Sequence, residues 1–445
     1  MNFSRIRIYA LVMIGLGAVT VTALALDAPH TMHHARSTST HFTESHRTVH
    51  HSAAAQVRLA TGRSATARAG TAHSSSAHTA QRSVHSSLSV RQSSRNTSRA
   101  GLRRVSSRRH RFNERFTASS FAKGDIFADD ITAGEDPVVR QAAINAMGDM
   151  NGTAVVIDPS NGRILAMVNQ KLALSPGAEP CSTIKLTVAM AAPSEGIVTR
   201  DTPVKLAGFR MNMTQALAKS NNLYFEELGR ELGFERVHQY ANRFGLGELA
   251  GYNIEGEQLG VYPDQPLPAS QGGVGRMCSF GQGVSLTPLQ LGAFVAALAN
   301  GGTLYYLQHP TSQEEAATLA PKVKRTLDIS KFVPDMEDGM AGAVEYGTAR
   351  RLRANFHELP VFGKTGTCSD KGTRFGWFAS WSDSPQGSLV TVFFLEGGRP
   401  TFGPRAAELT GEFYQNLWNS NWFTSRNPQN TATMWPPAAA ELVEP

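Results

Sequence analysis

The chain has 445 residues, and its formal net charge of +7 is distributed unevenly along them. Residues 27–120 hold 15 Arg, no Lys and three acidic residues, whereas residues 121–445 carry a net charge of −7. A basic tail joined to a mildly acidic body excludes a wholly basic nucleic-acid-binding domain, so we expect no nucleic acid among the partners. Eleven of the 14 His also lie in this tail. We therefore expect no histidine-rich metal site in the body, and no cofactor.

The N-terminus has the pattern of an export signal. Arg5 and Arg7 precede 19 uncharged, mostly apolar residues, which run from Ile8 to Leu26. This length suffices for a single membrane-spanning helix, and the positive charges before it predict that the N-terminus stays inside. A cleaved signal peptide over residues 1–26, with Ala23-Leu24-Ala25 as the cleavage site, is the alternative. In both cases the body lies in the periplasm or another extracytoplasmic space.

Residues 27–130 are expected to form a disordered linker. The segment is rich in Ser, Thr, Ala, Arg and His and nearly lacks aromatic and branched apolar residues. Such a composition cannot bury enough apolar surface to offset the loss of conformational entropy on folding. A solvated spacer is one interpretation, and contact with anionic lipid or cell-wall polymers is the other.

The body alternates between strand and helix patterns. Residues 153–158 and 163–168 predict two strands joined by an Asn161-Gly162 turn. Helical patterns follow from 182 to 300, where Thr287 caps the clearest helix and Pro288 opens it. Strand signals return at 360–367, 375–381 and 388–395, an amphipathic helix runs from Arg405 to about Trp418, and residues 425–445 form a Pro/Ala-rich, flexible tail. This order predicts one α+β domain over 140–424, with an antiparallel sheet built from both chain ends.

A candidate nucleophile lies in Pro180-Cys181-Ser182-Thr183-Ile184-Lys185. Pro180 and the following apolar run predict a helix that begins near Ser182, so Lys185 lies one turn further along the same face. A neutral lysine can take the proton of a serine hydroxyl and so make it nucleophilic. The tetrapeptide Ser-x-x-Lys recurs at Ser120–Lys123, but no helical pattern supports that copy.

Two further segments offer complementary chemistry. Ser220-Asn221-Asn222 places a hydroxyl and an amide on a loop, where they could relay a proton and bind a substrate amide; Ser220 as a simple helix cap is the structural alternative. Gly363-Lys364-Thr365-Gly366-Thr367 follows a strand pattern and offers a cation for a carboxylate, two hydroxyls and a glycine that permits close approach.

In this order, Ser-x-x-Lys, Ser-x-Asn and Lys-Thr-Gly-Thr resemble the three active-site motifs of the penicillin-binding protein transpeptidase family. The likeness extends to the hairpin at 151–167, to Phe280-Gly-Gln-Gly-Val-Ser-Leu-Thr-Pro-Leu-Gln290 with the Asn-Gly-Gly at 300–302, and to Gly347-Thr-Ala349; it covers about 145–420. It implies a β-lactamase/transpeptidase-like α+β fold, with an antiparallel sheet packed against helices and an all-helical subdomain.

The resemblance implies a serine D,D-transpeptidase that forms an acyl-enzyme with D-Ala-D-Ala stem peptides of peptidoglycan and is inhibited by β-lactams. Each residue of the three motifs then has an implied role: Ser182 as nucleophile, Lys185 as general base, Ser220 as proton relay, Asn222 as peptide ligand, Lys364, Thr365 and Thr367 as carboxylate ligands beside Gly366, and the N–H groups of Ser182 and Thr367 as the oxyanion hole. We expect Lys185 to be the neutral member of the two lysines, because two cations near one serine repel each other.

Three departures from the family and three alternatives stay open. No pedestal domain separates the N-terminal segment from the body, the interval from Ser182 to Ser220 is short, and Cys181 and Cys368 flank the first and third motifs. A D,D-carboxypeptidase or a β-lactamase would share the fold, although no Glu-x-x-x-Asn follows the second motif to activate a deacylating water. A non-catalytic β-lactam sensor or wall-binding module is the third alternative.

The three cysteines permit one disulfide of interest. If the N–H groups of Ser182 and Thr367 converge on one oxygen, the neighbouring Cys181 and Cys368 approach each other to about 6–10 Å between Cα atoms, which straddles the ~7 Å limit for a disulfide. Cys278 is an alternative partner, and burial as a free thiol is the alternative state.

Overall fold

The computed structural model describes residues 117–425 of the chain. The predicted membrane anchor or signal peptide, most of the predicted linker and nearly all of the predicted C-terminal tail lie outside these residues. Within 117–425, no helix combines the length and apolar character needed to cross a membrane.

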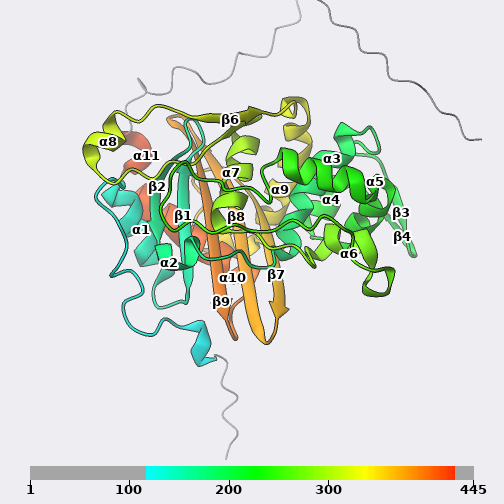
Figure 1. Cartoon of the computed structure of the whole chain (residues 1–445), viewed down its shortest axis with the longest axis horizontal. Coiled ribbons are helices and arrows are strands. Elements are labelled where there is room, and N and C mark those ends of the chain that lie inside the picture. The colour runs from blue at the N-terminus through cyan, green and yellow to red at the C-terminus, as the bar shows by residue number, and fades with distance from the viewer. Residues whose placement is uncertain (1–116, 426–445) are drawn as a thin grey trace, which may run out of the picture. The chain divides into compact units, whose positions relative to one another are not determined.

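A five-stranded antiparallel sheet forms the centre of the domain (Figure 1). Its strands are β1 (Gly152–Asp158), β2 (Arg163–Val168), β7 (Val361–Asp370), β8 (Thr373–Ser384) and β9 (Gly387–Gly397). Their order is β2-β1-β9-β8-β7, and β1 pairs with β9 from Gly152 opposite Leu395 to Ile157 opposite Val390. The early hairpin and the three late strands thus share one sheet, which confirms the predicted α+β architecture.

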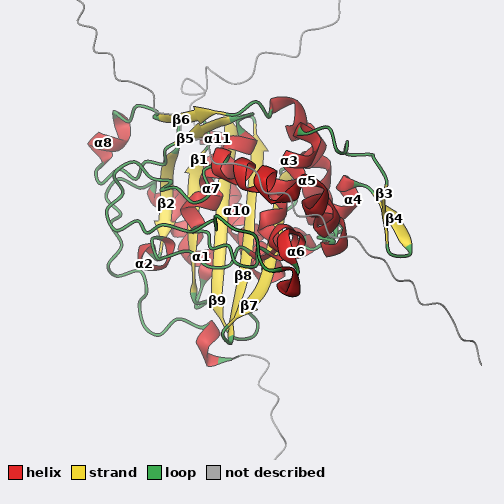
Figure 2. Cartoon of the chain, turned by 45° about the vertical axis from the view of Figure 1, so that its right-hand side comes forward, coloured by secondary structure: helices red, strands yellow, loops and turns green. Residues whose placement is uncertain are grey.

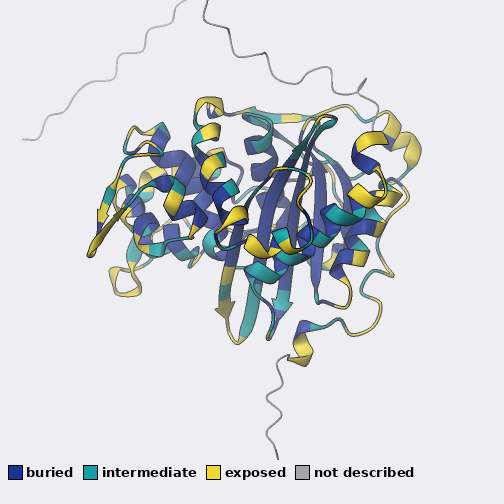
Figure 3. Cartoon of the chain, turned by 180° about the vertical axis from the view of Figure 1, so that it is seen from behind, coloured by how far each residue is buried: buried dark blue, intermediate teal, exposed yellow. Residues whose placement is uncertain are grey.

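Helices cover both faces of the sheet, and its strands are buried between them (Figure 3). The helices α1 (Pro137–Met147) and α10 (Gly403–Asn419) pack on one face, and α7 (Pro288–Ala299) packs on the other. Along β1, Val155 and Ile157 join the core on the α7 side, whereas Ala154 and Val156 join the core on the α10 side. Since successive side chains of a strand point to opposite faces, this continuous apolar run is what a sheet covered on both sides requires.

The predicted cap of α7 at Thr287 is present, and Gln290 extends it to a capping box. The Thr287 hydroxyl accepts from Gln290 N, the Gln290 side chain accepts from Thr287 N, and Pro288 opens the helix. The first N–H groups of a helix have no partner within it, and water does not reach the buried N-terminus of α7. The capping box therefore supplies acceptors for two of these donors.

A helical part stands beside the β7 edge (Figure 2). It contains α3 (Lys185–Ser194), α4 (Met213–Ala218), α5 (Asn222–Arg243), α6 (Gly273–Phe280) and α9 (Val333–Glu345). The remaining elements are short: α2 (Gln170–Ala173), α8 (Gln313–Ala317), α11 (Trp422–Ser425), the pair β3 (Val204–Leu206) and β4 (Phe209–Met211), the pair β5 (Thr303–Tyr305) and β6 (Val323–Thr326), and the 3₁₀ turns η1 (Ala118–Ser120), η2 (Cys181–Ile184), η3 (Ala269–Gln271), η4 (Ser330–Phe332) and η5 (Arg350–Ala354).

The domain begins earlier than the sequence predicts. Thr117 N donates to Arg399 O at 2.6 Å, Phe121 pairs with Met150 in an isolated β-bridge, and Asp130 forms an ion pair with Arg140 at 2.7 Å. Residues 117–130, assigned above to the disordered linker, are therefore part of the folded domain, and its predicted start at 140 is corrected. Backbone pairing, ion pairs and the packing of Phe121 and Phe127 against the core hold this segment, and two isolated aromatic residues produce no apolar periodicity.

Candidate active site

Three segments meet beside β7, the edge strand of the sheet. They are the η2 turn with the start of α3, the turn between α4 and α5, and the end of α6. Hydrogen bonds of two lysine side chains, Lys185 and Lys364, connect these segments. The helical part and the sheet thus contribute side chains to one site.

The first motif forms as the sequence predicts, with one local difference. Pro180 precedes a 3₁₀ turn over Cys181–Ile184, and the α-helix proper begins at Lys185 rather than at Ser182. The Lys185 Nζ atom lies 2.6 Å from Ser182 Oγ. Lys185 is fully buried, and this burial lowers its pKa to about 7 although Glu226 acts in the opposite direction.

Lys185 Nζ has two further partners, and they define its orientation. It donates to Asn222 Oδ1 at 2.7 Å and to the backbone oxygen of Ser279 at 2.7 Å. Both oxygens only accept hydrogen bonds, so they occupy two N–H groups of the amine. In the neutral amine, the remaining position is a lone pair that faces the Ser182 hydroxyl.

Aromatic rings enclose the same amine. The ring centroids of Phe225 and Phe280 each lie 5.9 Å from Lys185 Nζ. These rings are part of the surroundings that bury the amine, and burial lowers its pKa.

Ser220 lies between the two lysines. Its Oγ accepts from Lys364 Nζ at 2.7 Å and lies 3.5 Å from Lys185 Nζ. The residue has a φ of +52°, in the left-handed region that side chains rarely adopt. The next residue, Asn221, caps α5 by accepting from Tyr224 N at 3.0 Å, so the helix cap is Asn221 and the Ser220 hydroxyl is left for the site.

Lys364 is as deeply buried as Lys185. Its Nζ donates to Ser220 Oγ at 2.7 Å and to Thr365 O at 2.9 Å, and both acceptors are uncharged. Burial and the charge of Lys185 lower its pKa well below the ordinary value. Repulsion by Lys185 contributes to the lowered pKa of Lys364, whereas burial lowers the pKa of Lys185. Because both pKa values are lowered, the expectation that Lys185 is the neutral member of the pair stays a prediction.

The rest of the third motif positions β7. A Cβ on Gly366 would lie 2.8 Å from Pro180 O, so only glycine lets the strand approach the segment before Ser182 this closely. The Thr365 hydroxyl lies 2.6 Å from that of Thr348, and the exposed Thr367 accepts from Gly403 N at 2.8 Å.

Cys181 and Cys368 form a disulfide, with 5.5 Å between their Cα atoms. The alternative pairing with Cys278 is excluded, because Cys278 is a free, buried cysteine on α6. The bridge connects the residue before Ser182 to the residue after Thr367.

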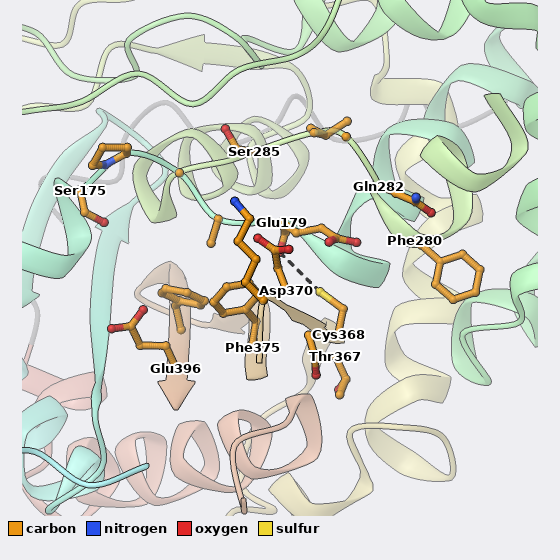
Figure 4. A pocket seen from close by; sticks show the side chains of 18 of the residues that line it. Ser175, Glu179, Phe280, Gln282, Ser285, Thr367, Cys368, Asp370, Phe375 and Glu396 are labelled. Carbon is orange, nitrogen blue, oxygen red and sulfur yellow. Dashed lines mark hydrogen bonds between the residues drawn. The ribbon is translucent and has the colours of Figure 1, made fainter. Parts of the chain in front are cut away.

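A cavity of about 840 Å³ opens next to this disulfide (Figure 4). Thr367, Cys368 and Asp370 from the end of β7 line it together with Glu179 and Phe280. Burial and the neighbouring Asp370 raise the pKa of Glu179.

The second Ser-x-x-Lys lies apart from the site. Ser120 is buried in η1, where its Oγ accepts from Thr401 at 3.2 Å, and Lys123 is exposed.

Two contributors to the site were not predicted. The backbone oxygen of Ser279 binds Lys185, and a backbone carbonyl has no signature in a sequence. Thr348 belongs to the Gly347-Thr-Ala349 segment that resembled the family, but its contact with Thr365 becomes visible only in the fold. Within residues 117–425, no cluster of His, Cys, Asp and Glu has the arrangement of a metal site.

The family model described as the penicillin-binding protein transpeptidase domain matches residues 152–414. Stage V sporulation protein D of Bacillus subtilis is 29% identical over 317 residues, which cover 59% of this chain and 48% of that protein. The peptidoglycan D,D-transpeptidase FtsI of Escherichia coli is 27% identical over 184 residues, which cover 34% of this chain and 31% of that protein. The chain thus spans about half or less of the length of these curated relatives.

Solved structures share the fold. Pseudomonas aeruginosa PBP2 in complex with WCK 5153 superimposes with a TM-score of 0.53 at 22% identity, and the match covers 63% of this chain and 76% of that one. The D,D-transpeptidase domain of a peptidoglycan glycosyltransferase from Eggerthella lenta gives a TM-score of 0.50 at 18% identity, covering 64% and 82% of the two chains.

Proposed function

The chain belongs to the penicillin-binding protein transpeptidase family, and we propose that it is a serine D,D-transpeptidase that cross-links peptidoglycan through an acyl-enzyme on Ser182. The observation that carries this proposal is the 2.6 Å contact between Ser182 Oγ and the buried Lys185 Nζ, whose pKa is lowered to about 7. A base with a pKa near the working pH is half neutral, so it can accept a proton and later return it.

In the acylation step, the Ser182 proton moves to the lone pair of Lys185 as Oγ bonds to the carbonyl carbon of the penultimate D-Ala. The N–H groups of Ser182 and Thr367 stabilise the oxyanion, a contribution of about 10²–10³ in rate per donor. Ser220 then protonates the leaving D-Ala nitrogen as the C–N bond breaks. Its position between Lys185 and Lys364 supports this relay, because either amine can replace the proton.

The third motif and Asn222 would bind the substrate. Lys364 and the hydroxyls of Thr365 and Thr367 would hold the terminal carboxylate, beside the close approach that Gly366 permits. Lys364 is desolvated and faces only uncharged acceptors, so an arriving carboxylate would restore its charged form. The amine of a second stem peptide then attacks the acyl-enzyme, which forms the cross-link and frees Ser182.

We further propose that residues 1–26 hold the catalytic domain outside the cytoplasmic membrane as a single-pass anchor, with the basic linker touching anionic wall or lipid groups. The Cys181–Cys368 disulfide supports an extracytoplasmic location, because such bonds persist in oxidising compartments.

The test uses the full-length protein and two substrates. With a fluorescent penicillin, we expect one covalent adduct per chain, stable for minutes and mapped to Ser182 by peptide mass analysis. Turnover of the antibiotic within seconds would instead identify a β-lactamase. With a D-Ala-D-Ala stem pentapeptide and an amine acceptor, we expect a cross-linked product, and hydrolysis alone would identify a carboxypeptidase. A penicillin adduct with neither product would identify a β-lactam sensor, and no adduct would identify a wall-binding module.

A further inference from the structure

We infer that the Cys181–Cys368 disulfide is a positioning element for acylation, which holds the backbone N–H groups of Ser182 and Thr367 in the mutual arrangement that the oxyanion requires. The inference rests on the proposed function, because these two N–H groups serve a reaction only if Ser182 is acylated.

The position of the bridge is the first argument. Its two cysteines are the direct chain neighbours of Ser182 and Thr367, yet they are 187 residues apart in the sequence. The nucleophile comes from the helical part of the domain and Thr367 from the sheet. The disulfide is therefore a covalent connection between the two elements at the point where their N–H groups must converge.

The backbone at Cys181 is the second argument. Its φ is +52°, in the left-handed region, although the residue is not a glycine. Such a conformation persists where the surrounding structure imposes it, and it is common at functional sites. Cys181 is immediately followed by Ser182, so any relaxation toward negative φ rotates the Ser182 N–H and side chain away from their places.

Noncovalent contacts also hold the junction between the segment before Ser182 and the sheet. Trp377 Nε1 donates to Glu179 O at 3.0 Å, and Gly366 lies against Pro180. Both contacts hold residues before Cys181, and Thr183 donates to Pro180 O across it, from its N–H at 3.1 Å and from its hydroxyl at 2.7 Å. The disulfide adds a covalent connection from Cys181 itself to β7.

The bridge is also open to chemical attack. Cys368 lines the cavity of Figure 4, whereas the third cysteine, Cys278, is completely buried. Burial raises the pKa of the Cys278 thiol to about 12, so this thiol is unreactive at neutral pH. Native-state thiol chemistry therefore reports on Cys181 and Cys368.

The experiment compares acylation of full-length variants by a fluorescent penicillin at 25 °C, with thermal melting recorded for each. In Cys181→Ala/Cys368→Ala, we expect the acylation rate constant to fall about 30- to 100-fold, because an ångström of misplacement in a site costs on the order of 10²-fold. In Cys181→Gly/Cys368→Ala, glycine accepts the positive φ without a bridge, so we expect a loss of less than about tenfold. Cys278→Ala, which removes a thiol and keeps the bridge, is the matched control.

The two double variants lose the same cross-link, so a purely structural role predicts equal acylation rates for both. The midpoint of the pH–rate profile should stay where it is in the wild type, because the contacts of Lys185 do not involve the bridge. Wild-type rates within about threefold for the alanine pair, or equal losses in the alanine and glycine pairs, would overturn the inference. A displaced midpoint would do the same, since the bridge would then act through Lys185.

A reduced sample covers the case in which the alanine pair does not fold. Wild-type protein treated with a phosphine reductant should lose acylation to the same extent and regain it on reoxidation, whereas full activity after complete reduction would refute the inference. Failure of the proposed function looks different: the untreated wild type would form no adduct at Ser182 at all.

Discussion

The tetrapeptide Ser-x-x-Lys occurs twice in the folded domain, and the two copies differ in the environment of the lysine and in the partner of the serine hydroxyl. At 182–185, the serine and lysine are 2.6 Å apart on one helical turn, and the lysine is buried. At 120–123, the serine is buried in a short 3₁₀ turn, the lysine is exposed, and the hydroxyl accepts a hydrogen bond from Thr401.

The difference shows which physical conditions turn a serine into a nucleophile. The helical turn brings the amine to the hydroxyl, burial lowers the pKa of the amine so that a neutral fraction exists near pH 7, and two carbonyl acceptors point its lone pair at the serine. Ser120 has none of these conditions, and its hydroxyl stabilises the fold. Four predictions test this contrast, in order of decreasing effect.

Replacing each of the two serines by alanine should give the largest difference between the two copies of the motif. Ser182→Ala should abolish the penicillin adduct, because it removes the hydroxyl that lies 2.6 Å from Lys185 Nζ, whereas Ser120→Ala should acylate like the wild type. Intact-mass spectrometry after penicillin treatment gives the result. An adduct that survives Ser182→Ala would refute the assignment of the nucleophile.

Replacing the two lysines by arginine tests the role of the neutral amine. Lys185→Arg keeps a positive charge but cannot supply a lone pair, so the acylation rate should fall by about 10³-fold or more. Lys123→Arg, at an exposed position, is the matched control and should leave the rate unchanged. Stopped-flow acylation measures both variants, and near-normal acylation by Lys185→Arg would exclude Lys185 as the base.

Ser220 supplies the proton path that the copy at 120–123 lacks. Ser220→Ala removes the hydroxyl between Lys185 and Lys364, and we expect acylation to slow by about 10²-fold, the lower range for general acid–base catalysis. Ser220→Gly also lacks the hydroxyl but adopts the positive φ without strain, so it shows whether the loss comes from the hydroxyl or from the backbone conformation. If Ser220→Gly acylates like the wild type, the relay is not needed.

Removing the segment before Asp125 should have the smallest effect, and it should change thermal stability only. A chain that begins at Asp125 lacks η1 and its contacts with Arg399, Met150 and Thr401, whereas a chain that begins at Thr117 keeps them. We expect the shorter chain to melt lower, by about 2–4 °C for each kcal/mol lost, with acylation at 25 °C unchanged. Calorimetry compares the two chains; equal melting temperatures would mean that this segment adds no stability.

Most of the sheet and the chemistry of the site could be predicted from sequence. The strands have continuous apolar runs, and the α7 helix carries its cap in Thr287 and Pro288, so local patterns suffice for both. The three motifs were recognisable because each groups reactive side chains within a few residues.

The features that failed prediction depend on contacts between distant segments. The Ser279 carbonyl, the Thr348 hydroxyl and the folded segment 117–130 owe their roles to partners that only the fold brings near. The sequence did not decide whether the disulfide forms, for the same reason. Cys181 and Cys368 are the chain neighbours of Ser182 and Thr367, which limits the distance between the two cysteines, but the direction of their side chains decides whether they bond.

The pH dependence of acylation tests the role of the buried lysine most directly. The pKa of Lys185 is lowered to about 7, and the neutral amine is the reactive form, so the acylation rate constant should rise about tenfold per pH unit below pH 7 and level off above it. The measurement is stopped-flow acylation of the wild type by a fluorescent penicillin from pH 5 to 10, over the range where melting curves show the protein folded. A rate that is constant across this range, or that rises only near pH 10 as for an ordinary lysine, would contradict the claim that burial prepares Lys185 as the base.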